Sequence, residues 1–437
     1  MEYIIPGLVT LGIIMILGFL GHYIFNRTQI PSIIWLLFFG VLLGFIFNIR
    51  GLIEPSYLMV ITQFIASIAI VIILFDGGIN TNLHQLFKGA SRGLLLSITA
   101  FCFTLLATMG VVIVLSAVIL PSIPVEQSVV IGLILGAIVG GTSSPIVIPL
   151  VNRLENLEEK TKMVLCIESI ITDPMCIVVV LAAIFMLSTI GSIDLAVGIR
   201  NLIITFSIGA VMGMVSGILW LPVMRRLHKD QYSYVVTLGV VFLVYAVTSM
   251  IPELGGEGAG AIACLVFGLV LGNGKQILKM IDYDGQKVEL DIEAKQFHSL
   301  FSFLIRTFFF VYLGLMVSFR NIQFILIGIL VLVVLLLVRY LAVYLSTLKG
   351  GFETDDKQTM IIMMPRGLAA AILALSFGPG LVDSLMPGMT DFFADITFVV
   401  ILGTALITTI GVFVISRSEK KKIKLKKPDH KKIKNKQ

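Results

Sequence analysis

Charge is scarce in this chain. Only 13% of its 437 residues are Asp, Glu, Lys or Arg, whereas a soluble domain usually carries about 25%. Polar stretches long enough to form a separate soluble domain are also missing. Hydrophobic residues make up 57% of the chain, and the mean hydropathy is +1.03. These features exclude an ordinary soluble protein and favour a chain that crosses a membrane many times.

Cysteine is rare as well. The four cysteines all fall in apolar stretches without CxxC spacing: Cys102, Cys166, Cys176 and Cys264. We expect them to act as small hydrophobic residues, not as disulfides or metal ligands. The histidines show no ligand spacing either, so we predict no transition-metal site. We also expect no cofactor and no enzymatic activity, since the Gly-x-Gly-Asp motif of an intramembrane aspartyl protease is absent. The net charge of +6 owes much to a basic tail at 417–437, which is typical of a segment near anionic lipid headgroups and not of a nucleic-acid surface.

Apolar runs of about 20 residues recur from end to end, and each is long enough to cross a bilayer. They predict an all-α polytopic membrane protein with about thirteen transmembrane helices, at approximate limits of 3–25, 31–48, 57–79, 93–119, 127–151, 161–188, 201–224, 232–251, 258–273, 297–317, 322–346, 358–378 and 391–416. Lys and Arg concentrate in alternate loops, which the positive-inside rule assigns to the cytoplasm. We therefore expect a cell-membrane protein with its N-terminus outside and its C-terminus in the cytoplasm.

Two spans contain helix-breaking residues near their centres. The fifth reads Gly140-Gly-Thr-Ser-Ser-Pro145, and the twelfth reads Pro365-Arg-Gly367. Irregular backbone at that depth is tolerated where it is buried in protein or lines a water-filled cavity. The breaks are seven spans apart, which predicts two inverted six-helix repeats whose discontinuous helices cross at mid-membrane. The alternative is that Pro and Gly are simply common in membrane helices.

The predicted repeats set the domain limits. The transmembrane domain covers 1–416, with a first repeat at about 1–188, a linker helix at about 201–224 and a second repeat at about 232–416. The basic tail follows.

The sixth span holds two carboxylates, although a charge at the bilayer centre costs about 2.5–3.5 kcal/mol. Asp173 lies four residues after Ser169, and Thr172 lies four after Glu168, so the members of each pair share a helix face. Oxygen ligands of this kind suit a small hard cation. Hydroxyl groups from the broken fifth span complete the candidate cation and proton site: Thr142, Ser143 and Ser144.

Three arginines also fall within spans: Arg306, Arg339 and Arg366. Buried cations near two buried carboxylates indicate that one carboxylate is structurally paired, while the other exchanges its occupant. Snorkelling toward the interface is the alternative, and it fits Arg339 best because that residue is near the inner end of its span. Asp76, at the cytoplasmic end of the third span, is a candidate for a cation-attracting funnel, although a helix-end turn explains its Asp-Gly-Gly motif equally well.

At these motifs the chain resembles the NhaP-type sodium/proton antiporters of the monovalent cation:proton antiporter superfamily. The resemblance runs to about residue 416, and its strongest points are four segments: Phe75-Asp-Gly-Gly, Glu168-Ser-Ile-Ile-Thr-Asp-Pro174, Phe303-Leu-Ile-Arg-Thr-Phe-Phe-Phe-Val-Tyr-Leu-Gly314 and Pro365-Arg-Gly367. It implies thirteen helices arranged as a six-helix core and a dimerisation domain, a homodimer, and exchange of Na⁺ for H⁺ by alternating access.

The resemblance also implies roles for individual residues. Asp173 corresponds to the carboxylate that binds the ion and the proton, and Glu168 and Ser169 belong to the same site. Glu168 is also held by an arginine, for which the family pattern points to Arg339, with Arg306 as the other candidate.

The chain departs from the family pattern at two positions. The family's Thr-Asp-Pro motif is replaced by Ser143-Ser144-Pro145, which removes a carboxylate and leaves the choice between Na⁺ and K⁺ open. The residue before Asp173 is the neutral Thr172, where an aspartate marks electrogenic relatives, so we expect electroneutral one-for-one exchange. K⁺/H⁺ exchange is the alternative, and a membrane receptor or scaffold is a more remote one.

Overall fold

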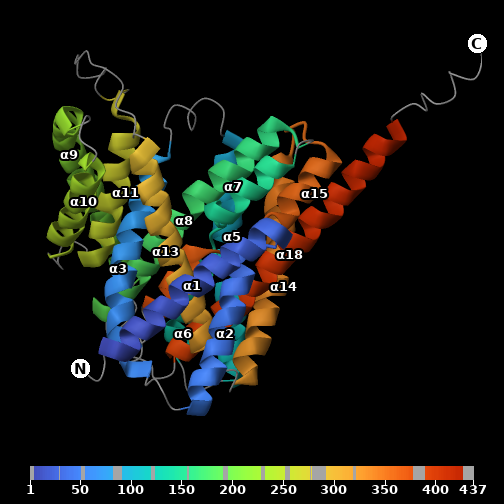
Figure 1. The fold of residues 1–437 in the computed structure, drawn as a ribbon, viewed down its shortest axis with the longest axis horizontal. Coiled ribbons are helices and arrows are strands. Elements are labelled where there is room, and N and C mark those ends of the chain that lie inside the picture. Colours follow the sequence, from blue (N-terminus) through green and yellow to red (C-terminus); the bar gives the residue numbers. More distant parts are fainter. Residues whose placement is uncertain are drawn as a thin grey trace, which may run out of the picture.

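The structure is a computed structural model that describes residues 4–28, 30–50, 55–81, 91–119, 124–154, 157–189, 195–227, 232–250, 256–275, 277, 292–317, 321–376 and 389–426. Within these ranges every regular element is a helix, and the helices form one elongated bundle (Figure 1). Their bounds are α1 (Ile4–Thr28), α2 (Ser32–Arg50), α3 (Pro55–Ile79), α5 (Ser91–Ile119), α6 (Val125–Ile138), α7 (Ser144–Arg153), α8 (Glu159–Thr189), α9 (Leu195–Leu227), α10 (Ser233–Ser249), α11 (Gly256–Gly272), α13 (Ile292–Met316), α14 (Ile322–Thr347), α15 (Thr354–Ile362), α16 (Leu368–Ser376) and α18 (Met389–Lys426).

The helices follow the predicted spans. Eleven spans correspond to one helix each, and the two interrupted spans correspond to the pairs α6–α7 and α15–α16. Six of the described helices are long and apolar enough to cross a membrane, and shorter apolar helices accompany them. The last helix runs beyond the predicted limit of 416 to Lys426, because the lysines that follow the span favour a helix. Figure 1 shows this end of α18 projecting past the other helices.

Packing divides the helices into two groups. In one group α11 packs against α3, α9 and α10, and α13 packs against α1 and α2. In the other, α5 packs against α6, α8 and α14, and α14 packs against α18. Figure 1 places α9, α10 and α11 at one side of the molecule and α14, α15 and α18 at the other. Contacts of α3 and α13 with α8 or α16 join the groups, and the candidate site lies at this junction.

Glycines bring α3 and α11 together at backbone distance. A Cβ atom added to Gly78 would lie 2.1 Å from the carbonyl oxygen of Leu265, and one added to Gly268 would lie 2.4 Å from that of Phe75. Small residues allow such approaches between membrane helices. The end of α3 that carries Asp76 is therefore packed directly against α11.

The two interrupted spans touch at their breaks. The chain unwinds between Ile138 and Ser144 in the first and between Ile362 and Leu368 in the second. The backbone N–H of Ser143 donates a hydrogen bond to the carbonyl oxygen of Pro365 at 2.8 Å, so the unwound segments lie against one another. Gly140 and Gly141 lie within the first break, and Pro145 lies in the first turn of α7, where its missing N–H removes no helical hydrogen bond. The discontinuous helices are thus present as predicted, while the limits of the two repeats stay a prediction.

Candidate functional site

A cavity of about 410 Å³ lies where α3, α7, α8, α13 and α16 meet. Its ionisable lining residues are Asp76 from α3, Asp173 from α8 and Arg306 from α13. Further polar lining comes from Asn80, Ser144 and Ser302, and the apolar lining residues come from α3, α7, α8 and α16. The cavity therefore brings together carboxylates that are nearly a hundred residues apart in the sequence.

Asp173 is the carboxylate with access to this cavity. It is partly exposed, whereas Glu168 on the same helix is only 1% exposed. Asp173 lies near Ser144, the first residue of α7, since both residues line the cavity. The N-terminus of a helix favours negative charge there, because its N–H groups are free and its dipole is positive at that end. Asp173 thus lies beside the start of α7 and is open to the cavity.

Asp76 also belongs to the cavity and is not only an end-of-helix residue. The side-chain amide of Asn80 donates a hydrogen bond to Oδ1 of Asp76 at 2.7 Å. The sequence left two explanations for Asp76, a cytoplasmic funnel and a helix-end turn; in the structure Asp76 lines the same cavity as Asp173.

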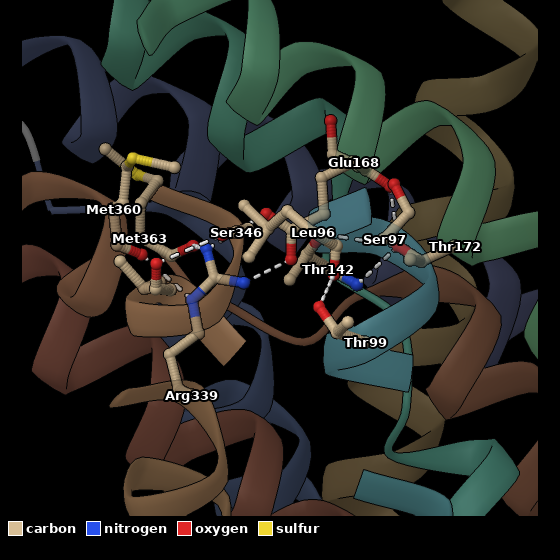
Figure 2. Close-up of polar contacts among 12 residues, drawn as sticks. Leu96, Ser97, Thr99, Thr142, Glu168, Thr172, Arg339, Ser346, Met360 and Met363 are labelled. Carbon is tan, nitrogen blue, oxygen red and sulfur yellow. Dashed lines mark hydrogen bonds and ion pairs between the residues drawn. The ribbon is translucent and has the colours of Figure 1, made fainter. Parts of the chain in front are cut away.

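Glu168 is held inside the protein by Arg339. Figure 2 shows the Arg339 side chain reaching from α14 toward Glu168. Its two terminal nitrogens bond the two carboxylate oxygens of Glu168, with Nη2 to Oε2 at 2.9 Å. Arg339 also donates to the carbonyl oxygens of Met360 at 2.9 Å and Met363 at 3.0 Å. Because Arg339 is only 3% exposed, it does not snorkel, and of the two candidate partners Glu168 contacts Arg339.

Several predicted ligand hydroxyls contact backbone atoms. Thr172 Oγ1 donates to the carbonyl oxygen of Glu168 at 2.9 Å and accepts the N–H of Thr142 at 3.0 Å (Figure 2). Thr142 Oγ1 lies 3.3 Å from Thr172 Oγ1. Ser169 Oγ donates to the carbonyl oxygen of Cys166 at 3.0 Å. These three residues do not line the cavity, since their hydroxyls bond within α8 or join α8 to the first break.

Arg366 bonds the end of the first broken helix. Its Nη1 donates to the carbonyl oxygens of Gly140 at 3.0 Å and Gly141 at 2.7 Å, just beyond α6. The last carbonyls of a helix lack partners within it and carry partial negative charge. The Arg366 guanidinium therefore compensates the end of α6, and Arg366 is among the charged neighbours of Asp173.

The structure adds site residues that the sequence reasoning missed. Asn80 follows Asp76 by four residues, and Ser302 precedes Arg306 by four, so each pair shares a helix face. This four-residue spacing from Asp76 and Arg306 was the sequence feature that could have identified Asn80 and Ser302.

A second cavity, of about 200 Å³, adjoins the first. It shares Pro145, Arg306 and Leu368 with the larger cavity and is also lined by Ser143 and His22. Among the described residues, no three or more His, Cys, Asp or Glu side chains are grouped to hold a metal ion.

Comparisons with known proteins agree on one family. The sequence profile described as "sodium/hydrogen exchanger, transmembrane" matches residues 12–417. Na(+)/H(+) antiporter 1 of Methanocaldococcus jannaschii is 26% identical over 415 residues, which are 92% of this chain and 91% of that protein. The K(+)/H(+) antiporter NhaP of Alkalimonas amylolytica is also 26% identical, over 86% of this chain but 61% of its own length.

A solved structure has the same fold. The sodium proton antiporter MjNhaP1 from Methanocaldococcus jannaschii superimposes with a TM-score of 0.75 at 24% sequence identity, covering 95% of this chain and 98% of that one. The fold is therefore that of a polytopic membrane antiporter.

Proposed function

Because the chain belongs to the transmembrane sodium/hydrogen exchanger family, we propose that it exchanges Na⁺ for H⁺ across the cell membrane by alternating access, and that Asp173 binds both ions in turn. The observation that supports this assignment is that two carboxylates on the same helix differ in burial and in charge pairing. Glu168 is buried and bonded by Arg339, whereas Asp173 is open to a cavity. A carboxylate whose charge is already paired is costly to separate from its partner, so the exchangeable site is Asp173.

The exchange is electroneutral. One carboxylate binds either one Na⁺ or one H⁺, so the loaded site carries the same charge in both directions. Thr172 adds no charge, because its side chain is a neutral hydroxyl; that hydroxyl bonds the backbone of Glu168 and Thr142. An imposed membrane potential therefore leaves the exchange rate unchanged.

K⁺/H⁺ exchange is the second candidate. Ser144 stands where the family pattern has an acidic residue, and a cation loses one charged ligand as a result. Relatives named K(+)/H(+) antiporters match this chain at 26–29% identity, although the chain spans only 61% or 40% of their length. Weaker electrostatic binding favours the less strongly hydrated ion, because its dehydration costs less.

The topology and assembly are proposed on the sequence pattern. The N-terminus lies outside and the C-terminus in the cytoplasm, where the basic tail that begins within α18 meets anionic lipid. The transporter works as a homodimer, as the family resemblance implies.

The test is cation-driven proton flux in proteoliposomes. Purified protein is reconstituted with a pH-sensitive dye inside, and Na⁺ or K⁺ is added outside. Asp173→Asn should reduce the flux to background while its thermal unfolding midpoint stays near that of the wild type. Asp355→Asn is the matched control, because it removes an exposed carboxylate from the start of α15, outside the cavity.

Each outcome has a defined meaning. Substantial flux through folded Asp173→Asn protein would overturn the assignment of that carboxylate. A larger flux with K⁺ than with Na⁺ would establish the second candidate. With Na⁺ as the substrate, a flux that rises steeply with a potential set by valinomycin and K⁺ would contradict electroneutral exchange.

A further inference from the structure

Each helix break leaves backbone N–H groups without helical partners. The first residues of a helix have no carbonyl four positions earlier to accept their N–H groups. Inside a membrane, water does not replace those partners, so the protein itself must supply them. At the second break the N–H of Arg366 meets this requirement by donating to Oγ1 of Thr404 on α18, at 3.1 Å.

Thr404 matches Thr172 in its contacts. Thr404 Oγ1 donates to the carbonyl oxygen four residues earlier, that of Val400, at 2.7 Å, as Thr172 does to Glu168 at 2.9 Å. Each hydroxyl also accepts one N–H from the break of the preceding interrupted span. Both residues are 0% exposed. The same device therefore supports both breaks.

The two breaks are also bonded to each other. Arg366, whose N–H is bonded by Thr404, uses its guanidinium to bond the carbonyls of Gly140 and Gly141. Ser143 donates its N–H to Pro365, the residue before Arg366. Since Ser144 follows Ser143 and lines the same cavity as Asp173, a chain of contacts runs from Thr404 to the wall of that cavity.

We propose that Thr404 is a positioning residue for cation exchange. Its hydroxyl fixes the second break, which in turn holds the first break ahead of α7 through the bonds of Arg366 to Gly140 and Gly141 and of Pro365 to Ser143. The inference rests on the proposed function of Asp173. Thr404 lines neither cavity and is followed by Ala405 where Thr172 is followed by Asp173. It therefore acts on the site only through Arg366 and the two breaks.

The test compares three variants of the full-length protein in proteoliposomes. Thr404→Val keeps the shape of the side chain but removes the acceptor of the Arg366 N–H, and it should raise the apparent KM for Na⁺ about tenfold, the size of effect expected from one orphaned buried donor. Thr404→Ser keeps the hydroxyl and should restore most of the affinity. Thr409→Val is the control, because its hydroxyl bonds only the carbonyl of Ala405 in its own helix, and its KM should stay at the wild-type value.

The KM separates positioning from a purely structural role. Loss of folded protein lowers the maximal rate per total protein and leaves KM unchanged, so that pattern in Thr404→Val would overturn the inference. Should Thr404→Val fail to fold, Thr408→Val is a milder perturbation of the same second break. It removes the hydroxyl donor to the carbonyl of Ile362, which keeps its bond from the N–H of Met364.

Thr408→Val should raise KM about threefold, by a bond of modest net strength, and an unchanged KM there would likewise overturn the inference. A wild-type protein without cation-driven flux would instead overturn the proposed function itself. An active wild type whose KM is unaffected by loss of the Thr404 hydroxyl would overturn the positioning role alone.

Discussion

Removing either partner of the Glu168–Arg339 pair should destabilise the protein strongly. Removing one partner of a buried ion pair typically costs about 3–5 kcal/mol, because the other charge is left without compensation. Glu168→Gln should cost about 3 kcal/mol, at the lower end, since Arg339 keeps its bonds to the carbonyls of Met360 and Met363. Arg339→Met should cost more, because it orphans the Glu168 carboxylate and also those two carbonyls, at about 1–3 kcal/mol for each buried group left unpaired.

The double variant distinguishes a direct pair from two separate contributions. Once Arg339 is gone, Glu168→Gln neutralises an uncompensated charge, so the second substitution should cost little or even restore stability. We expect the double variant to be at least about 2 kcal/mol more stable than the sum of the single losses predicts.

The assay is unfolding of the purified protein in mixed micelles with increasing SDS, followed by the fluorescence of the two tryptophans. Arg306→Met is the matched control, because Arg306 lines the cavity and should show no coupling to Glu168→Gln. Additive losses for Glu168 and Arg339, or coupling of Glu168 to Arg306 instead, would refute the reasoning.

Two further substitutions probe the cavity and its neighbour. Asp76→Asn removes a carboxylate that shares the cavity with Asp173, so it should raise the apparent KM for Na⁺ several-fold, by about 1 kcal/mol of lost attraction, while sparing the maximal rate. A KM equal to that of the wild type would exclude Asp76 from cation attraction. Thr172→Asp places a second carboxylate beside Asp173, and cation-driven flux should then depend on an imposed potential. Flux that stays independent of potential would mean that this position does not set the stoichiometry.

The number and order of the helices could be predicted from hydropathy, because segments that cross the hydrocarbon core of a bilayer must be apolar. Each apolar run has to match the thickness of a bilayer, and the interrupted spans were visible as Gly and Pro at their centres. The extension of α18 to Lys426 was missed, since lysines end an apolar run but favour a helix in water. A change of solvent along a continuous helix cannot be recognised from hydropathy alone.

The site was less predictable than the fold. The spacing of the carboxylates identified α8 correctly. The sequence alone could not show which of the nearby hydroxyl groups are free to bind an ion, so all of them were predicted as ligands. In the structure Ser169 and Thr172 bond carbonyls three and four residues earlier, a local contact that competes with any ligand. The contacts of Thr404 and Arg366 join segments 38 and more residues apart, which no local pattern encodes.

The different settings of Glu168 and Asp173 follow from helix geometry. Successive residues of an α-helix are rotated by about 100°, so two residues five positions apart point about 140° away from each other. On α8 this difference directs Glu168 toward Arg339 of α14 and Asp173 toward the cavity with α3 and α13. The ion pair that bonds α8 to α14 is therefore separate from the carboxylate at which we propose that ions are exchanged.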